Sequence, residues 1–399
     1  MNYALNIAET ASSALCFDYS EEQRMLYDMI HAFVEKECPK DLARKLEAAP
    51  EFPWELYRKL GAAGLYGIGL PEEYGGQGGG IVEQVIVCTE LSRTLAGLSV
   101  LWHLNCWSGA KAIQGNGTEE QKRHYLPRIA AGEMLFAISM TEPGGGTDVL
   151  RATRTTATRV DGGYRINGTK IWSTLAHVAD KLLVLARSEP NEKPSRGLSV
   201  FIVDAKAEGV KATPIPKLGL RSLGSCEVVF DDVFVPESDI IGEPGTGWSQ
   251  IVGSLNNERI LTAAMCTGMI EGVLEDAVRY SLDRKAFGKQ IGEMQSIQHK
   301  IADIAMNLET ARLHTRRAAW LQSIGRKCDV EATMAKCLAA EYAVAAADEG
   351  IQILGGMGYS AETDMQRYWR DARLFRIGPI TSEMSRNHIG ESLGLPRSF

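Results

Sequence analysis

The chain has 399 residues, more than one compact core usually serves, so two or three packed parts sharing an interface are expected. Its 43 basic and 50 acidic residues give a net charge of −7, without the basic stripe that binds nucleic acid or an anionic membrane. Neither partner is therefore expected, and no run of about 18 apolar residues predicts a membrane span.

Cysteine use and the first residues point to a cellular location. The eight cysteines are scattered, with no CxxC pair and no histidine pair at metal-ligand spacing, so we interpret them as reduced thiols and expect no metal site. Residues 1–20 (MNYALNIAETASSALCFDYS) contain no charged leader followed by an apolar core. We expect a soluble, cytoplasmic protein.

The first third of the chain is predicted to be helical. A Ser20/Gln23 capping box opens a segment whose apolar residues recur at helical spacing, namely Met25, Leu26, Met29, Ile30, Phe33 and Val34. Similar patterns follow in 54–64, 80–95 and 118–131, joined by glycine-rich connectors at 74–80 and 115–118. We assign residues 1–132 to an N-terminal all-helical domain.

The middle of the chain, residues 133–245, is predicted to form a β-domain. Asp161-Gly162 and Asn167-Gly168 are both interpreted as tight hairpin turns, because these pairs accept positive φ. The short apolar runs KLLVLA, GLSVFIV and CEVVFDDVFV continue the pattern as strands.

Helical periodicity returns in the last part, residues 246–399. Four long segments, about 248–282, 293–325, 328–354 and 363–375, are expected to form an antiparallel bundle. The predicted order is therefore helices, β-domain, helices.

Two motifs in the middle part indicate a ligand site. In MTEPGGGTDV (140–149), glycines allow backbone N–H groups to approach a planar or phosphorylated ligand, although such a segment taken alone is more often a turn. In KIWST (170–174), Trp172 and Thr174 are expected on one face of a strand, although a lone Trp usually lies in the core.

Together these motifs resemble the acyl-CoA dehydrogenase family, whose TEPGxGSD and WIT stretches hold the isoalloxazine ring of FAD. The resemblance extends over nearly the whole chain. It implies an α+β fold with an N-terminal helical domain, a middle β-barrel and a C-terminal four-helix bundle. It also implies a flavoprotein oxidoreductase of fatty acid or acyl-CoA metabolism, with FAD as cofactor and a thioester of CoA or of acyl-carrier protein as substrate.

The resemblance assigns roles to five residues near the flavin ring. Met140 and Thr141 would bond the pyrimidine edge, Trp172 would flank the ring, and Thr174 would reach N5. Thr147 stands where the family usually has Ser and would contact the cofactor and the pantetheine end of the substrate.

Two further motifs match the segments with which a neighbouring subunit grips the pyrophosphate and adenosine of FAD. They are RKAFGKQIGEMQ (284–295) and QILGGMGYS (352–360), and the matching residues are Arg284, Phe287, Gln295, Gln352, Gly355 and Gly356. The resemblance therefore implies a homotetramer, built as a dimer of dimers.

The usual catalytic base is absent. Many members carry it as Glu in YEGTSQ, where the same residue also gives an N–H to the substrate carbonyl. Counted from RDA (370–372), this chain reads GPITSE: Gly378, Pro379 and Ile380 replace Tyr, Glu and Gly. Both the carboxylate and the N–H are lost at Pro379, whereas Thr381 keeps its place as a cofactor contact.

Glu258, in SLNNERIL, occupies the position where the isovaleryl and long-chain branches carry their base, at the start of the first bundle helix. The alternative is that a helix dipole alone favours an acidic residue in a first turn. Arg259 matches an arginine near the CoA moiety, and Glu383 is the reserve candidate for the base. His103 and Trp107 are candidates for the acyl pocket, or are ordinary packing residues.

These features predict an FAD-dependent acyl-CoA dehydrogenase that removes an α-proton and a β-hydride, with electron-transfer flavoprotein as the expected electron acceptor. Three alternatives stay open. They are catalysis in the enoyl-CoA reductase direction, a flavin monooxygenase on the same fold, and a catalytically silent subunit of a hetero-oligomer.

Overall fold

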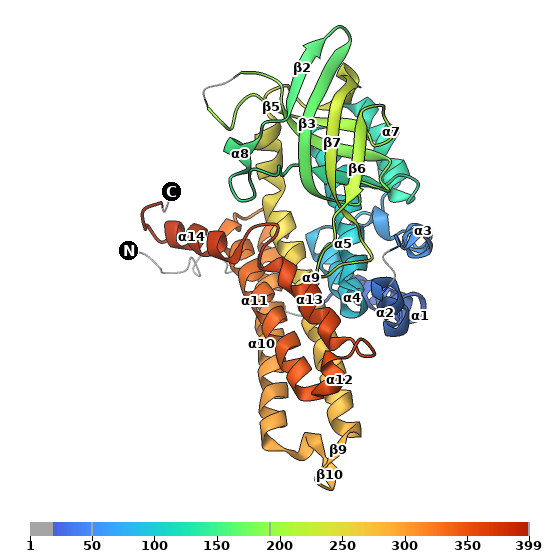
Figure 1. The fold of residues 1–399 in the computed structure, drawn as a ribbon, viewed down its shortest axis with the longest axis vertical. Coiled ribbons are helices and arrows are strands. Elements are labelled where there is room, and N and C mark those ends of the chain that lie inside the picture. The colour runs from blue at the N-terminus through green and yellow to red at the C-terminus, as the bar shows by residue number, and fades with distance from the viewer. Residues whose placement is uncertain (1–18, 49–50, 191–192, 398–399) are drawn as a thin grey trace.

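The computed structural model describes residues 19–48, 51–190 and 193–397, without the side chains of residues 107 and 108. Figure 1 shows a β-sheet at one end, long helices extending away from it, and the N-terminal helices packed at their side. Within the described residues no helix is both long and apolar enough to cross a membrane.

Helices form the regular structure up to Ala130. The predicted capping box is confirmed at the start of the first helix, where the Ser20 side chain accepts a hydrogen bond from the N–H of Gln23. The helices are α1 (Glu21–Glu37), α2 (Lys40–Ala48), α3 (Trp54–Ala62), α4 (Ile81–Thr94), α5 (Ala96–Leu104), α6 (Ala112–Asn116) and α7 (Glu119–Ala130). A π-helical segment, Asn105–Lys111, joins α5 to α6.

Eight strands form one sheet, which is the predicted β-domain in the middle of the chain. They are β1 (Phe136–Ser139), β2 (Thr156–Val160), β3 (Gly163–Thr174), β4 (Lys181–Arg187), β5 (Leu198–Asp204), β6 (Val210–Pro214), β7 (Ser225–Pro236) and β8 (Ile240–Ile241). Their order is β6-β7-β3-β2-β4-β5-β8, and β1 pairs in parallel with β4. Leu182 and Leu183 belong to different core clusters on opposite faces, which explains the continuous apolar run of β4.

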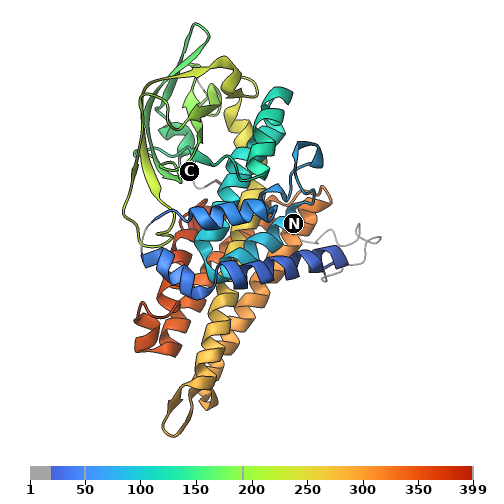
Figure 2. The same cartoon turned by 90° about the vertical axis from the view of Figure 1, so that its right-hand side faces the viewer.

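The four predicted bundle helices are confirmed as α9 (Gly247–Asp283), α10 (Gln295–Ser323), α11 (Asp329–Leu354) and α13 (Met365–Phe375). Strands β9 (Lys285–Ala286) and β10 (Lys289–Gln290) form a hairpin between α9 and α10 at the end of the molecule opposite the sheet (Figure 1). Short helices α8 (Val149–Ala152) and α12 (Gly356–Tyr359) and a last helix, α14 (Ser382–Ser392), complete the chain. Figure 2, turned by 90°, shows the N-terminal helices lying across the bundle.

The hairpin predicted at Asn167-Gly168 is wrong. Asp161-Gly162 does form the β2–β3 turn, but β3 continues through Asn167 and Gly168 with a register shift against β7. Asn167 accepts a hydrogen bond from the N–H of Asp232 at 2.8 Å, and a Cβ on Gly168 would lie 2.5 Å from the Thr155 hydroxyl. The pair therefore makes a β-bulge, which needs the same residue types as a turn.

Candidate active site

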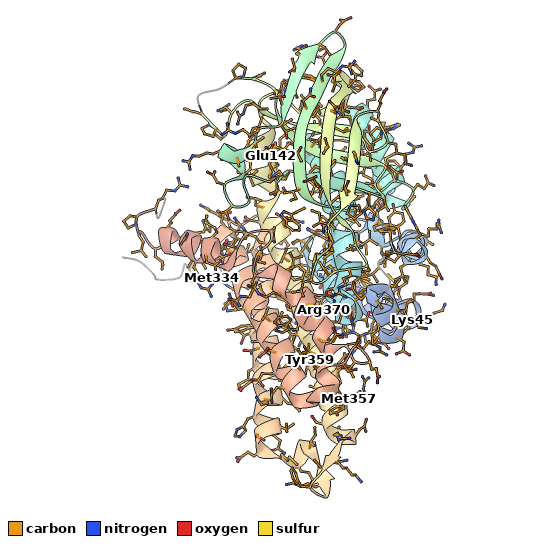
Figure 3. All side chains as sticks on the ribbon, viewed as in Figure 1. Lys45, Glu142, Met334, Met357, Tyr359 and Arg370 are labelled. Atoms are coloured by element: carbon orange, nitrogen blue, oxygen red, sulfur yellow. The ribbon has the colours of Figure 1, made fainter. Side chains whose placement is uncertain are left out.

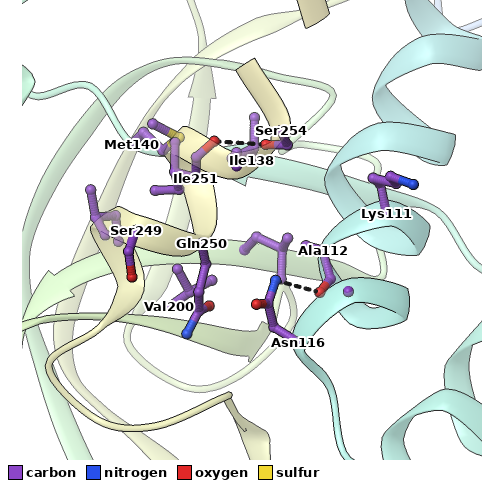
Figure 4. Close-up of a pocket in the computed structure, with 14 residues that line it drawn as sticks. Lys111, Ala112, Asn116, Ile138, Met140, Val200, Ser249, Gln250, Ile251 and Ser254 are labelled. Carbon is purple, nitrogen blue, oxygen red and sulfur yellow. Dashed lines mark hydrogen bonds between the residues drawn. The ribbon is translucent and has the colours of Figure 1, made fainter. Parts of the chain in front are cut away.

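A cavity of about 220 Å³ lies where the sheet, α6 and the first turns of α9 meet. Figure 4 shows Ile138 and Met140 on one side, Ala112 and Asn116 of α6 opposite, and the start of α9 between them. Most of its lining is aliphatic, with Lys111, Asn116, Ser249, Gln250 and Ser254 as polar members. Such a chamber suits an apolar chain that carries a few polar groups.

The predicted flavin motifs are brought together beside this cavity. The N–H of Ile171 donates to the carbonyl of Thr141 at 2.8 Å, so the 140–149 loop is hydrogen-bonded to strand β3. Trp172 is 56% exposed and Ser173 is buried, which places the indole ring on the outer side of the strand. A large exposed aromatic next to the backbone of Met140 and Thr141 fits a planar ring stacked against it.

A buried ion pair holds this loop to the strand. Lys170 Nζ lies 2.9 Å from Glu142 Oε1 and donates to the Met140 carbonyl at 3.0 Å. Glu142 also accepts the N–H groups of Arg154 and Thr155, each at 2.8 Å. Burial acts to raise the pKa of Glu142, but Lys170 and these donors lower it below its usual value, so the carboxylate stays ionised. The sequence analysis missed this pair, although both residues lie inside the two motifs.

The other two residues assigned near the ring lie at the edges of this region. The Thr174 hydroxyl is 2.9 Å from the hydroxyl of Ser225, which also accepts from Lys217 at 3.1 Å. Thr147 is exposed in the bend before α8, next to Asp148, which caps that helix. Thr174 is thus held by a hydrogen bond to Ser225, whereas Thr147 is open to solvent.

Glu258 is not at the start of its helix, so that part of the prediction is wrong. Helix α9 begins at Gly247, and Glu258 lies about three turns further along. A helix dipole acts only within the first turn and cannot explain an acidic residue here. Ile251, Ser254 and Glu258 share one helical face, and the first two line the cavity.

Electrostatics make Glu258 suited to proton transfer. It is partly buried and forms no hydrogen bond or ion pair with another residue in the described part of the chain. Burial raises the pKa of Glu258 to about 7, and the positive charges of Arg259 and Lys336 oppose this rise. An unpartnered carboxyl with a pKa near neutrality is what a general base requires.

Arg259 lies next to Glu258 and is held from α11. It donates to the Asn256 side chain at 3.2 Å, and Asn256 donates to Asp329 at 2.7 Å. Burial lowers the pKa of the Arg259 guanidinium, while Glu258 and Asp329 oppose that shift. The arginine is thus placed beside the cavity face of α9 with donors left for a ligand.

The loop at Gly378–Thr381 connects α13 to α14. The Gly378–Pro379 peptide bond is cis, and Lys336 on α11 donates a hydrogen bond to the carbonyl of Ile380. Thr381 caps α14 by accepting the N–H of Met384 at 3.1 Å. Pro379 offers no N–H to a substrate carbonyl.

Glu383 is a poorer base than Glu258. It is exposed in the first turn of α14, where hydrogen bonds from its own backbone N–H and from Thr381 lower its pKa. Its carboxylate therefore binds a proton less readily than an ordinary glutamate does.

The residues of the two motifs matched to a neighbouring subunit lie far from the flavin-ring residues of the same chain. Arg284 and Phe287 belong to the hairpin region beyond α9, Gln295 begins α10, and Gln352, Gly355 and Gly356 lie at the end of α11 and the start of α12. Figure 3 shows this separation through Glu142 beside the sheet and Met357 and Tyr359 on α12. The Phe287 side chain is 96% exposed.

Of the two candidates for the acyl pocket, the structure describes the side chain of His103. His103 is buried, lies outside the cavity lining, and has its pKa lowered to about 4 by burial, which makes it a neutral packing residue. The side chain of Trp107 lies outside the described part of the structure. The described residues also contain no cluster that could hold a metal ion.

Comparisons with known proteins match all three parts of the chain. Family models for the N-terminal, middle and C-terminal domains of acyl-CoA dehydrogenase match residues 20–133, 137–233 and 245–394. A probable acyl-CoA dehydrogenase of Bacillus subtilis, YngJ, is 35% identical over 94% of this chain and 99% of its own length.

Solved structures of similar proteins superpose on nearly the whole chain. Butyryl-CoA dehydrogenase of Megasphaera elsdenii superposes with a TM-score of 0.91 at 32% identity, over 96% of this chain and 100% of that one. The FAD complex of PigA superposes with a TM-score of 0.90 at 28% identity, over 96% of this chain and 100% of that one.

We predict that Lys170→Met lowers the free energy of unfolding by about 3 kcal/mol or more, because it leaves the Glu142 carboxylate buried without its cation. It also removes the donor to the Met140 carbonyl, so FAD affinity falls as well. Denaturant unfolding and FAD titration measure the two effects. The control is Lys181→Met, which removes the more exposed partner of Asp204 and is expected to cost less than about 1 kcal/mol. Equal losses in both variants would contradict the role of Lys170.

Proposed function

Since the chain belongs to the acyl-CoA dehydrogenase family, whose members are flavin-dependent oxidoreductases with FAD as cofactor, we propose that it dehydrogenates an acyl thioester with Glu258 as the base. The observation that carries the proposal is the environment of the Glu258 carboxyl group. Its carboxyl is partly buried, unpartnered and of pKa about 7, on the helix face that lines the cavity.

Different residues of this chain would serve different steps of the reaction. Glu258 takes the α-proton of the thioester, and the nearby charges of Arg259 and Lys336 favour its ionised form before that step. Bound FAD supplies the acceptor for the β-hydride. Met140, Thr141 and Thr174 would hold the flavin ring, with Trp172 beside it, and the aliphatic lining of the cavity would exclude water from the acyl chain.

The substrate carbonyl lacks the backbone donor that position 379 gives in other members. One such donor is typically worth ~3 kcal/mol in the transition state. In this chain the enolate charge has to be stabilised by other groups, and the loop shape fixed by Pro379 is part of a site adapted to its own thioester. Catalysis through Glu258 does not need the lost carboxylate.

We also propose that two chains complete each FAD site within a homotetramer. The ring-binding residues lie beside the sheet, whereas Arg284, Phe287 and Gln352 lie at the opposite end of the bundle, so one chain cannot bring both groups to one cofactor. The exposure of Phe287 and Trp172 is consistent with surfaces that a second copy and FAD cover. The parts predicted at 1–132, 133–245 and 246–399 would act as the three domains of this subunit.

Electron-transfer flavoprotein is the proposed acceptor for the reduced cofactor. One solved structure, from work on the electron transferring flavoprotein of Acidaminococcus fermentans, superposes on this chain with a TM-score of 0.92. The cytoplasmic location stays a prediction.

We predict that Glu258→Gln retains FAD but slows flavin reduction by an acyl thioester on the order of 10²-fold or more, because glutamine keeps the size and loses the basicity. Stopped-flow absorbance of the flavin measures the rate. Glu383→Gln is the matched control and should reduce at the parent rate. If Glu383→Gln is the slow variant, the base has been assigned to the wrong residue.

That experiment also separates the alternatives. A parent enzyme whose flavin is not reduced by any thioester, alone or as a homo-oligomer, would favour a silent subunit. Fast reoxidation of reduced flavin by oxygen in the presence of the thioester would favour a monooxygenase.

The rate of flavin reduction at low substrate concentration should rise with pH and level off above about 7. The sign follows from the base: Glu258 has to be ionised to accept a proton, and its pKa is about 7. Below that value the rate falls about tenfold per pH unit. A profile without this inflection, or one that falls as pH rises through 7, would contradict a carboxylate base in this environment.

Arg284→Ala should weaken FAD binding about 10- to 100-fold, because a charged hydrogen bond to the pyrophosphate from the neighbouring subunit is lost. Equilibrium dialysis of FAD measures the change. Arg279→Ala is the control, since Arg279 is an exposed arginine in the last turns of α9, just before Arg284, and is paired with Asp276. Equal FAD affinity in both variants would argue against sharing of the cofactor between chains.

A further inference from the structure

Lys336 on α11 is a fully buried cation between two parts of the proposed active site. Its side chain is inaccessible to solvent, and its ammonium group donates to the carbonyl of Ile380 in the loop after α13. The same ammonium group is one of the two positive charges that act on Glu258. No motif or family resemblance singled out this lysine.

The contact with Ile380 ties the altered loop to the bundle. Ile380 follows Pro379 directly, and the next turn is held by the N–H of Ser382, which donates to the carbonyl of Arg376 at 3.0 Å. Cys337, beside Lys336 on α11, lies 3.9 Å from the carbonyl of Ser382. Helix α11 therefore holds the backbone of the loop on both sides of Thr381.

Among the groups that act on the charge of Lys336, Glu258 is the one that belongs to the proposed site. Cys266 on α9 and Cys337 and Glu341 on α11 also face the lysine. Burial raises the pKa of both thiols, which keeps them neutral. Glu341 is already paired with Arg376 at 2.9 Å and with Arg386 at 3.4 Å. From α9, Arg259 is the other cation that acts on Glu258.

We propose that Lys336 is a positioning residue that couples the base to the altered loop: its ammonium group fixes the Ile380 carbonyl and at the same time stabilises the ionised carboxylate of Glu258. This inference rests on the proposed function of Glu258. A carbonyl dipole alone compensates a buried ammonium group incompletely, so a negative charge nearby is favoured. When Glu258 takes a proton from the substrate, its negative charge is lost. The ammonium group of Lys336 then has the Ile380 carbonyl as its remaining partner within the site.

Three substitutions separate the two tasks of Lys336. Lys336→Arg keeps a donor and a charge, Lys336→Gln keeps an N–H donor for Ile380 but loses the charge, and Lys336→Met loses both. Each is prepared as the FAD-loaded holoenzyme. The pKa of Glu258 is read from the infrared band of its protonated carboxyl as pH is varied, with Glu258→Gln as the spectral blank. Amide hydrogen exchange in residues 376–382 reports on the loop.

Loss of the charge should raise the pKa of Glu258 by about one unit or more, since a nearby opposite charge lowers a carboxyl pKa by about that amount. We expect this rise in both Lys336→Gln and Lys336→Met, whereas Lys336→Arg stays near the parent. Faster amide exchange of the loop is expected in Lys336→Met alone. If Lys336→Met does not fold, the comparison of Lys336→Gln with Lys336→Arg decides the electrostatic part.

An unchanged titration of Glu258 in the variants without the charge overturns the proposal, and so does equal loop exchange in the Gln and Met variants. Neither readout needs turnover, so this failure is distinct from failure of the proposed function. The latter would appear as a parent enzyme whose flavin no thioester reduces, whatever the titration of Glu258 shows.

Discussion

Partial desolvation of one carboxylate is the constraint on which the site depends. A base that removes a carbon-bound proton near neutral pH has to hold that proton firmly and still be ionised beforehand. Burial of Glu258 on the cavity face of α9 meets the first demand, and the positive charges of Arg259 and Lys336 meet the second. A direct ion pair would lower the pKa of Glu258 and remove its basicity. The absence of such a pair in the described residues is therefore as important as the presence of nearby charge.

The same constraint connects distant parts of the chain. Glu258 lies on α9, Lys336 on α11 and Ile380 in the loop that has lost the usual base, so helix packing in the bundle sets the electrostatics of the site. The flavin motifs are fixed in a similar way, because the buried Lys170–Glu142 pair holds the 140–149 loop against β3. In the proposed function the cofactor would contact surfaces that one chain keeps at opposite ends, so assembly would be a condition for activity.

Much of this arrangement follows from the sequence, and the exceptions have physical causes. Amphipathic helices such as α1 were predictable because one face is exposed, whereas α5 is buried all round and shows no such periodicity. Asn167-Gly168 has the composition of a turn, but only the pairing of β3 with β7 reveals a bulge. Family motifs supplied the proposed flavin residues and Glu258 as the proposed base. The position of Glu258 well inside α9, and the contact of Lys336 with Ile380, depend on packing between segments far apart in sequence.

The central claim, that Glu258 is the base, is tested most directly by isolating its proton transfer. A thioester with α-hydrogens but no β-hydrogen can lose an α-proton and cannot transfer a hydride, so solvent deuterium enters only through the base. Mass spectrometry of this thioester after incubation with the enzyme in D₂O should show deuterium at the α-carbon with the parent and with Glu383→Gln, and none above background with Glu258→Gln. Undiminished exchange by Glu258→Gln would contradict the account.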